Sequence, residues 1–310
     1  MEYGKSVNLY LLILNTMSIF EYNNFDSPLN VGDDNPHMKK CVFCQNKLEV
    51  FSINDYWDVD LKEIYNFHQL GKSWCHEEGI DEEMWELDLS TYSCEVYFHH
   101  CNKCGWWRII KDVTVSAKVW QLWQFFYGTV GLLKKLDLHN IDVPINEISK
   151  YLLAKYEARF SLHPKLFEDV TGQVFKNLGY DAIVTGYSND GGIDVILEKQ
   201  GKQIGVQVKR YKNKIKVDQI RELTGALFLS GIPSGIFVTT SDFQSGANKV
   251  VQKSSNRGMP IELINATRFY DILKLTTESK LDKENIRNKL ELALNSKLFS
   301  YNWENPMNSL

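Results

Sequence analysis

GGIDVILEKQGKQIGVQVKR, residues 191–210, carries the sequence pattern of a β-hairpin. Apolar residues alternate with polar or small ones on both sides of a short turn, with the period of two expected of half-buried strands. If Gln200 and Gly201 form a two-residue turn, apolar residues face each other across the hairpin: Ile193 with Val208, Val195 with Val206 and Leu197 with Ile204. The same register places Asp194 opposite Gln207.

This register gathers three polar groups at one end of the hairpin. Opposite residues have Cβ atoms roughly 4.5–5.5 Å apart, so Asp194 and Gln207 are close enough to share one metal ion. Lys209 then faces Gly192, which has no side chain to crowd it. A carboxylate, an amide and an ammonium in this arrangement can hold a divalent metal against a phosphodiester. The alternative is an ordinary solvated strand face, although Asp is disfavoured inside strands.

A basic run overlaps the hairpin in a chain that is mildly acidic overall, at formal charge −4. Residues 199–216 contain seven Lys or Arg and no acid. Such a local excess of positive charge predicts a patch that binds phosphate. The candidate nucleic-acid-binding residues are Arg210, Tyr211, Lys212, Lys214 and Lys216.

At these residues the chain resembles the Mrr-type restriction endonuclease catalytic domain, a branch of the PD-(D/E)xK nuclease superfamily. The resemblance covers residues 163–275, and its motifs stand in the family's order and spacing. The matching pieces are HPKLFE at 163–168, GY at 179–180, DGGIDV at 190–195, QVKRY at 207–211, GIFVTTS at 235–241 and Ala247. The branch often has Gln where the superfamily name expects Asp or Glu, so Gln207 is consistent with an active site.

The resemblance implies metal-dependent hydrolysis of DNA phosphodiesters. Asp194 would anchor the metal, with Gln207 offering its amide oxygen and Val208 its backbone carbonyl. Hard oxygen ligands of this kind suit Mg²⁺ or Mn²⁺. Lys209 would position or help to deprotonate the attacking water and offset charge in the transition state. Glu168 would lie near the metal, directly or through water, on a helix whose apolar stripe is Phe167, Val170, Val174 and Leu178.

The remaining pattern of this region predicts an α/β fold, with a mixed central sheet flanked by helices. Strands are expected at 180–185, 234–240 and 260–264, and helices at 217–229, 245–255 and 267–275. The inward residues of the helix at 217–229 are expected to be Ile220, Leu223 and Leu227, with Thr224 as a further candidate. Thr239, Thr240 and Ser241 end a strand, where they either contact phosphate or cap a helix. Gln219 and Arg221 are further candidates for contact with nucleic acid.

Two CxxC pairs, Cys41/Cys44 and Cys101/Cys104, supply a second chemical signal. Four thiolates in two such tight turns can hold one structural Zn²⁺ in a closed tetrahedral site. The span 45–100 between the pairs is longer than the usual zinc-ribbon spacing, and disulfides or plain buried thiols are the alternatives. Substitute ligands would be Cys75, Cys94, His99 and His100.

The span between the two Cys pairs is acidic. Between Phe51 and Tyr97 many acids are opposed only by Lys62 and Lys72 among the lysines and arginines, which makes a poor surface for a DNA backbone. A basic protein partner or simple solvation are the two explanations. The aromatic residues after the second pair are expected to lie in a core rather than stack on bases: Trp106, Trp107, Trp120, Trp123, Phe125, Phe126 and Tyr127.

The 310 residues suggest at least two domains. We expect an N-terminal segment and linker at 1–36, a zinc-ribbon-like module with the acidic insert at 37–116, a helical connector at 117–160, the nuclease domain at 161–278 and a C-terminal helix and tail at 279–310. Within the connector, Pro144 to Phe160 predicts one helix with Asp142 near its cap. The apolar segment from Val7 to Phe20 is too short and too polar for a membrane span.

The sequence thus predicts a cytoplasmic, Mg²⁺- or Mn²⁺-dependent DNA endonuclease with structural zinc, acting in restriction or anti-phage defence. Its partner is expected to be double-stranded DNA, with a second copy of the chain or a defence-system protein as further partners, and no membrane. The winged-helix pattern found before the nuclease domain in a familiar family arrangement is missing, so recognition of methylated DNA does not carry over. Two alternatives stay open: a catalytically silent DNA-binding or assembly module, and a nuclease acting on RNA or single strands.

Overall fold

The computed structural model describes residues 19–24, 38–52, 72, 76–79, 81, 87–117, 122–186, 191–279 and 302–304. Most of these residues divide into two compact units. One unit lies within 135–278, and the other lies within 20–134 together with Ser279 and residues 302–304. The first unit contains the predicted nuclease region and the second contains both Cys pairs.

The first unit is built on a five-stranded sheet within the described residues, in the order β10-β9-β8-β7-β6. Strands β6 to β8 pair antiparallel, whereas β8, β9 and β10 pair parallel, so the sheet is mixed as expected. The strands are β6 Asp181–Val184, β7 Val195–Lys199, β8 Lys202–Lys209, β9 Gly235–Thr239 and β10 Ile261–Ile264.

The hairpin of β7 and β8 has the predicted register. Val195 pairs with Val206 and Leu197 with Ile204, and both apolar pairs are largely buried. Gln200 and Gly201 form the turn with φ of 54° and 72°. Positive φ at both central residues is typical of the tight turn whose twist matches that of a hairpin.

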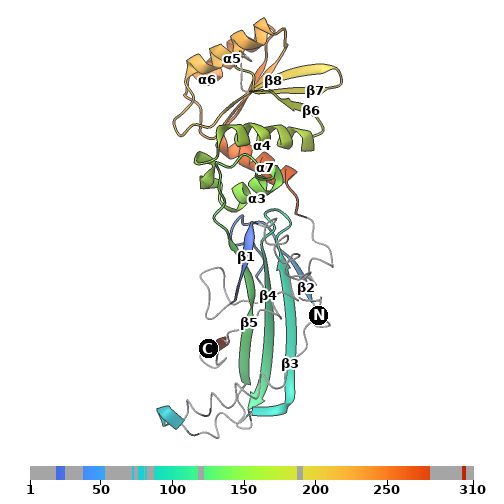
Figure 1. Cartoon of the computed structure of the whole chain (residues 1–310), viewed down its shortest axis with the longest axis vertical. Coiled ribbons are helices and arrows are strands. Elements are labelled where there is room, and N and C mark those ends of the chain that lie inside the picture. Colours follow the sequence, from blue (N-terminus) through green and yellow to red (C-terminus); the bar gives the residue numbers. More distant parts are fainter. Residues whose placement is uncertain are drawn as a thin grey trace, which may run out of the picture. The chain divides into compact units, whose positions relative to one another are not determined.

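Helices cover both faces of this sheet (Figure 1). On one face α4 packs against β6, β7 and β8, with α3 and α7 beside it, and on the other α5 and α6 pack against each other. The helices are α3 Ile145–Ala154, α4 Pro164–Asn177, α5 Val217–Leu229, α6 Ala247–Ser255 and α7 Ala266–Thr276. The mixed α/β fold with flanking helices is therefore confirmed.

Two glycines allow α5 to approach the sheet closely. Gly205 of β8 pairs with Gly235 of β9, and Leu227 of α5 lies against both. A Cβ atom on either glycine would lie 2.6 or 2.5 Å from a Leu227 methyl carbon, which is closer than real contacts permit. Ile220, Leu223 and Leu227 are buried as predicted, and Thr224 is half-buried.

The helix predicted from Pro144 to Phe160 is interrupted. Helix α3 ends at Ala154, Lys155 leaves helical geometry with φ −142° and ψ 76°, and a 3₁₀ helix follows at Tyr156–Phe160. The Tyr156 hydroxyl donates a 2.6 Å hydrogen bond to the Ala266 carbonyl, a tertiary contact that helical periodicity does not report. The N-cap is Pro144 itself, with no side-chain capping bond, so the cap role predicted near Asp142 is wrong.

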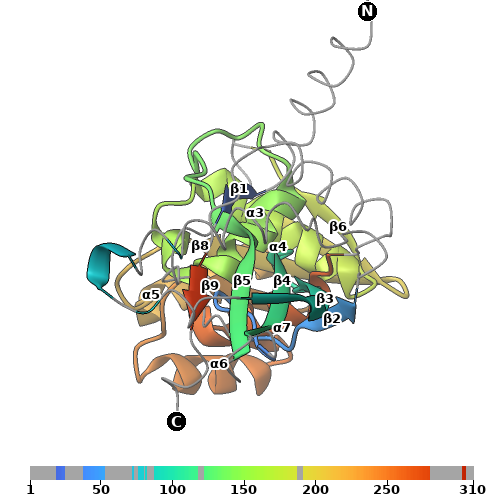
Figure 2. The ribbon, with the colours of Figure 1, turned by 90° about the horizontal axis from the view of Figure 1, so that it is seen from below.

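The second unit is a long antiparallel sheet in the order β1-β5-β4-β3-β2, with β11 pairing on β5. Figure 2 shows β3, β4 and β5 side by side. The strands are β1 Phe20–Asn24, β2 Glu49–Ser52, β3 Leu87–His100, β4 Trp107–Ala117, β5 Leu122–Leu133 and β11 Asn302–Glu304. Trp106 and Trp107 are buried in the core, as predicted.

The connector expected to be helical at 117–160 is partly β-strand, so the prediction is wrong for that part. Residues 122–133 form β5, because their aromatic and β-branched side chains favour a pleated strand. The expected N-terminal segment and linker at 1–36 includes strand β1, since Phe20 to Asn24 pair with β5. The remainder of that linker, most of the acidic insert and the tail at 280–301 lie outside the described residues. Within the described part of the chain, no helix has the length and apolar character to cross a membrane.

Candidate active site and cysteine cluster

The Asp194 carboxylate is hydrogen-bonded to the backbone of strand β8 at Val208, the residue after Gln207. Its Oδ2 atom accepts a 2.6 Å hydrogen bond from the Val208 amide, and its own amide donates to the Val206 carbonyl at 2.8 Å. The pairing of β7 with β8 begins one residue later, at Val195. The sequence predicts that Asp194 pairs with Gln207 across the hairpin. Instead, the Asp194 side chain bonds to the backbone of the next residue, Val208.

Gln207 presents a buried amide oxygen that lacks a hydrogen-bond donor. Its side chain is 3% exposed, and Oε1 has no hydrogen-bond partner among the described residues. Burying such a group without a partner costs about 1–3 kcal/mol, so the oxygen is available to a cation. Gly192 lines the same space: a Cβ there would lie 3.2 Å from Gln207 Nε2, and its φ of +95° also favours glycine.

Glu168 lies on α4 near the Asp194 carboxylate. Partial burial raises its pKa above the usual 4.5, and the negative charge of Asp194 adds to that rise. Lys165 opposes the shift, with Nζ 3.2 Å from Glu168 Oε2. Two carboxylates and an unpartnered amide oxygen thus occupy the region where the sequence predicts a divalent metal, and these hard oxygen donors suit Mg²⁺ or Mn²⁺.

Sequence reasoning missed two residues that organise this region. The Thr185 hydroxyl donates to the carbonyls of Ile193 and Asp194, both at 2.9 Å, and so fixes the backbone that carries the acid. Lys165 links Glu168 to the Thr185 carbonyl, the latter at 3.0 Å. The spacing of Lys165 and Glu168 on a helix is a signal that could have revealed their pairing.

Lys209 ends β8 and is half-buried. Its ammonium group makes no hydrogen bond or ion pair with another described residue, whereas its carbonyl is held firmly. That carbonyl accepts from the Thr239 hydroxyl at 3.0 Å and from the Thr240 amide at 3.2 Å. The ammonium is therefore available to an anionic ligand while its backbone is fixed.

The basic loop that follows β8 consists of residues 210–216. Three consecutive hydroxyls hold it in place. Those of Thr239, Thr240 and Ser241 donate to the carbonyls of Lys209, Tyr211 and Lys212, at 3.0, 2.9 and 3.0 Å. The helix-cap role predicted for these hydroxyls is wrong, because the N-caps of α6 and α7 are Gly246 and Asn265. Their contact with phosphate stays a prediction.

Within the basic loop the side chains divide by orientation. Tyr211, Lys212, Lys214 and Lys216 are exposed, and Lys214 forms a 3.5 Å ion pair with Asp242. Arg210 instead turns inward, where its guanidinium donates a 2.6 Å hydrogen bond to the Phe160 carbonyl. Arg210 thus anchors the 3₁₀ helix. Gln219 caps α5 through the Lys216 amide, and Arg221 pairs with Asp218 at 2.7 Å.

The four cysteines of the two CxxC pairs meet in one buried cluster in the second unit. All four sulfurs lie within 4.8 Å of one another, with Sγ atoms 3.6 Å apart for Cys41 and Cys104 and 3.4 Å apart for Cys44 and Cys101. A Zn–S bond of ~2.3 Å in a tetrahedron separates sulfurs by roughly 3.8 Å, so the donor set fits zinc. The four cysteines are not joined by disulfides.

The two CxxC turns share one backbone design. The amides of Gln45 and Gly105 donate to the carbonyls of Cys41 and Cys101, at 3.0 and 2.9 Å. Both donors have positive φ, 59° and 81°. Hydrogen bonding within the cluster lowers the pKa of Cys44 and Cys101, which favours their thiolate forms. It raises the pKa of Cys41 and Cys104.

The substitute ligands are not needed to complete this cluster. Among the described residues, the group of four cysteines is the one set of three or more His, Cys, Asp or Glu able to hold a metal. His99 and His100 are buried on β3, and Cys94 is half-buried on the same strand; none of them belongs to the group. Cys75 lies outside the described residues.

Comparison with a family model finds a match inside the first unit. Residues 160–273 match the family model Mrr_cat, described as a restriction endonuclease. The chain is 34% identical over 104 residues to the type IV methyl-directed restriction enzyme EcoKMrr of Escherichia coli (strain K12), covering 31% of this chain and 34% of that enzyme. It is 28% identical over 180 residues to the uncharacterized protein y4cE of Sinorhizobium fredii, covering 51% of this chain and 44% of that protein.

The chain spans less than half the length of each of these curated relatives. Among solved structures, a protein of unknown function, AF1548, has a TM-score of 0.30 at 16% identity over 46% of this chain and 79% of its own. The MspJI restriction endonuclease in complex with a 27-mer oligonucleotide has a TM-score of 0.29 at 15% identity over 52% of this chain and 38% of its own. The matches in sequence confirm that residues 160–273 are an Mrr-like restriction endonuclease domain.

Proposed function

We propose that this chain is a Mg²⁺- or Mn²⁺-dependent endonuclease that hydrolyses phosphodiester bonds of double-stranded DNA. The observation that carries the proposal is the buried Gln207 amide oxygen, which has no hydrogen-bond partner among the described residues. The next residue, Val208, donates its amide to the Asp194 carboxylate. A bound cation would be coordinated by the Gln207 amide oxygen and would offset the negative charge of the Asp194 carboxylate.

Asp194, the Gln207 amide oxygen and the Val208 carbonyl would hold the metal, with Glu168 alongside. The bound ion would supply Lewis-acid activation of water and of the phosphoryl group. Lys209 would donate hydrogen bonds to the phosphate oxygens and so stabilise the negative charge that develops on them in the transition state. Lys165 keeps the Glu168 carboxylate oriented, and Thr185 keeps the Asp194 backbone in place.

The likeness to a restriction enzyme and the exposed basic loop support DNA as the substrate and restriction or anti-phage defence in the cytoplasm as the role. Zinc in the cluster of four cysteines would be structural, because four sulfur ligands leave no open coordination position. The second unit would then select the target or a partner.

A plasmid cleavage assay with Mg²⁺ or Mn²⁺ tests the proposed activity. We expect Asp194→Ala and Lys209→Ala each to lower the rate by about two orders of magnitude or more while the melting temperature stays near that of the native protein. Asp181→Ala and Lys202→Ala, exposed positions on the same sheet, are the matched controls. Intact plasmid with every divalent ion tried would refute the enzyme, and faster cleavage of RNA or single strands would replace the substrate.

A further inference from the structure

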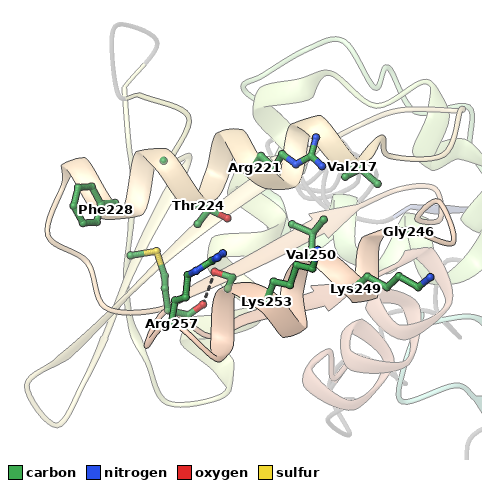
Figure 3. Close-up of a pocket in the computed structure, with 12 residues that line it drawn as sticks. Val217, Arg221, Thr224, Phe228, Gly246, Lys249, Val250, Lys253 and Arg257 are labelled. Atoms are coloured by element: carbon green, nitrogen blue, oxygen red, sulfur yellow. Dashed lines mark hydrogen bonds between the residues drawn. The ribbon is translucent and has the colours of Figure 1, made fainter.

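A groove of about 840 Å³ lies between α5 and α6, on the first unit (Figure 3). Its volume is within the range of sites that hold small molecules or short polymer segments. Neither the active-site residues nor the comparisons account for it. Figure 3 shows Phe228 toward one end of α5, with Arg221 and Val217 toward the other and Lys249, Lys253 and Arg257 along the facing segment.

The lining of this groove is strongly cationic. It contains Arg221, Lys249, Lys253 and Arg257, all exposed, and no acid. In the described part of the chain, Lys249, Lys253 and Arg257 form no ion pair, and Arg221 pairs only with the exposed Asp218. Unpaired cations gathered along one groove attract a polyanion.

An exposed aromatic side chain and an open stretch of α5 backbone also line the groove, and they indicate what kind of polyanion fits it. Phe228 lines the groove and is 75% exposed, so its ring is open to a ligand. Gly225 has open space where a Cβ would lie, so a ligand can approach the backbone of α5 closely. A cationic groove with an exposed aromatic ring is the combination that binds single-stranded nucleic acid, with phosphates on the cations and a base stacked on the ring.

The groove also begins next to the end of the basic loop, because Val217, which lines it, follows Lys216 directly in the chain. Ile215 bridges to Phe243, and its amide donates to the Asp242 carbonyl at 2.8 Å, so the loop is joined to residues 242–243. These two segments lead directly into Val217 and Gly246, which line the groove. A strand that leaves Lys209 along Lys212, Lys214 and Lys216 would therefore reach the groove next.

We propose that the α5–α6 groove binds a short single-stranded stretch of the nucleic acid whose phosphodiester lies at Asp194 and Lys209. This proposal rests on the proposed nuclease function. A strand held there would fix which part of a frayed or displaced substrate enters the active site.

Fluorescence anisotropy on the full chain, without added divalent cation so that no cleavage occurs, tests the groove directly. The probes are labelled single strands of one to twelve nucleotides and a duplex of the longest length. For Lys249→Glu/Lys253→Glu we expect at least tenfold weaker binding of the single strand, with the slope of log affinity against log salt smaller by roughly 1.4. Phe228→Ala should weaken it at least about fivefold with an unchanged slope.

The control pair Lys135→Glu/Lys176→Glu changes the charge equally at exposed positions that do not line the groove, and we expect less than a twofold effect. If the double reversal lowers the melting temperature, Lys249→Gln/Lys253→Gln replaces it. Native affinity in the groove variants would overturn the proposal. So would affinity that is already maximal with one nucleotide, or a loss confined to duplex with Phe228→Ala silent. Failure of the native protein to cleave in the plasmid assay refutes the nuclease function separately, because binding is measured under conditions where no cleavage occurs.

Discussion

The backbone amide of Val208 donates a 2.6 Å hydrogen bond to the carboxylate of Asp194. One strand, β8, thereby carries Gln207 and Lys209 and also holds the acid that precedes β7. The spacing of these three groups is set by the backbone of a single hairpin rather than by long side chains. Changes to individual side chains should therefore alter the chemistry of the site without unfolding the sheet.

Gln207→Met should raise stability and remove activity together. The substitution keeps a similar volume and removes a buried oxygen that has no hydrogen-bond partner among the described residues. We expect a gain of about 1 kcal/mol in unfolding free energy when no divalent cation is present. Added Mg²⁺ should raise the melting temperature of the native protein but not of the variant, because only a ligand that binds the folded state stabilises it. Thermal denaturation with and without Mg²⁺ measures both effects, and a destabilised variant would contradict the assignment.

Glu168 should make stability fall as the pH rises. Its folded pKa is raised above 4.5, so the folded protein holds the proton more tightly than the unfolded chain does. The contribution of the protonated group is complete below pH 4.5 and is lost as pH rises through the folded pKa. Glu168→Gln should therefore gain stability relative to the native protein between pH 4.5 and neutrality. Urea unfolding at several pH values tests this, with the exposed Glu222→Gln as control; a difference independent of pH would be contrary evidence.

Cys101→Ser should release zinc and destabilise the second unit. Structural zinc contributes directly to folding free energy, so loss of one thiolate from a closed four-sulfur site should cost several kcal/mol. Metal analysis is expected to give about one zinc per native chain and a large decrease in the variant. Cys94→Ser, which removes a half-buried thiol outside the cluster, is the matched control. Equal zinc in Cys101→Ser and native protein would disprove the site.

Thr240→Val should loosen the basic loop without disturbing the sheet. The substitution keeps the side-chain shape but removes the 2.9 Å bond to the Tyr211 carbonyl. A net loss of about 1 kcal/mol is expected, together with faster amide exchange across residues 210–216 and weaker DNA binding. Thr276→Val removes a hydroxyl bonded within α7 and serves as control. Unchanged exchange in the loop would argue that the hydroxyl bonds are incidental.

The hairpin and the helices beside it could be predicted because their signals are local. Alternation fixed the register of Val195 and Val206, and α5 begins and ends where its apolar spacing indicated. The inward turn of Arg210 could not be predicted, because its partner, the Phe160 carbonyl, lies 50 positions away. The break at Lys155 and the use of three hydroxyls on loop carbonyls likewise depend on contacts made only after the sheet has assembled.

Some residues of the candidate site could likewise be predicted from local sequence, and others could not. Asp194, Gln207 and Lys209 stand close together in sequence, so their shared location followed from one register. Glu168 reaches the region from a separate helix, and only its resemblance to a family motif indicated it. The role of Thr185 could not be predicted, because it acts through hydrogen bonds to backbone carbonyls. The helical spacing of Lys165 and Glu168 indicates that these two can pair, but not that Lys165 also bonds to the Thr185 carbonyl.

The pairing of β2 with β3 starts next to the cysteine cluster, at Glu49 and His100. Each CxxC turn is therefore attached to one strand of the same pair, and the strand pair holds the turns together. The pairing of β2 with β3, rather than the number of residues between Ser52 and Leu87, therefore brings the two turns together. The long interval between the two CxxC pairs is thus compatible with one compact cluster, because strand pairing joins the ends of that interval beside the sulfurs.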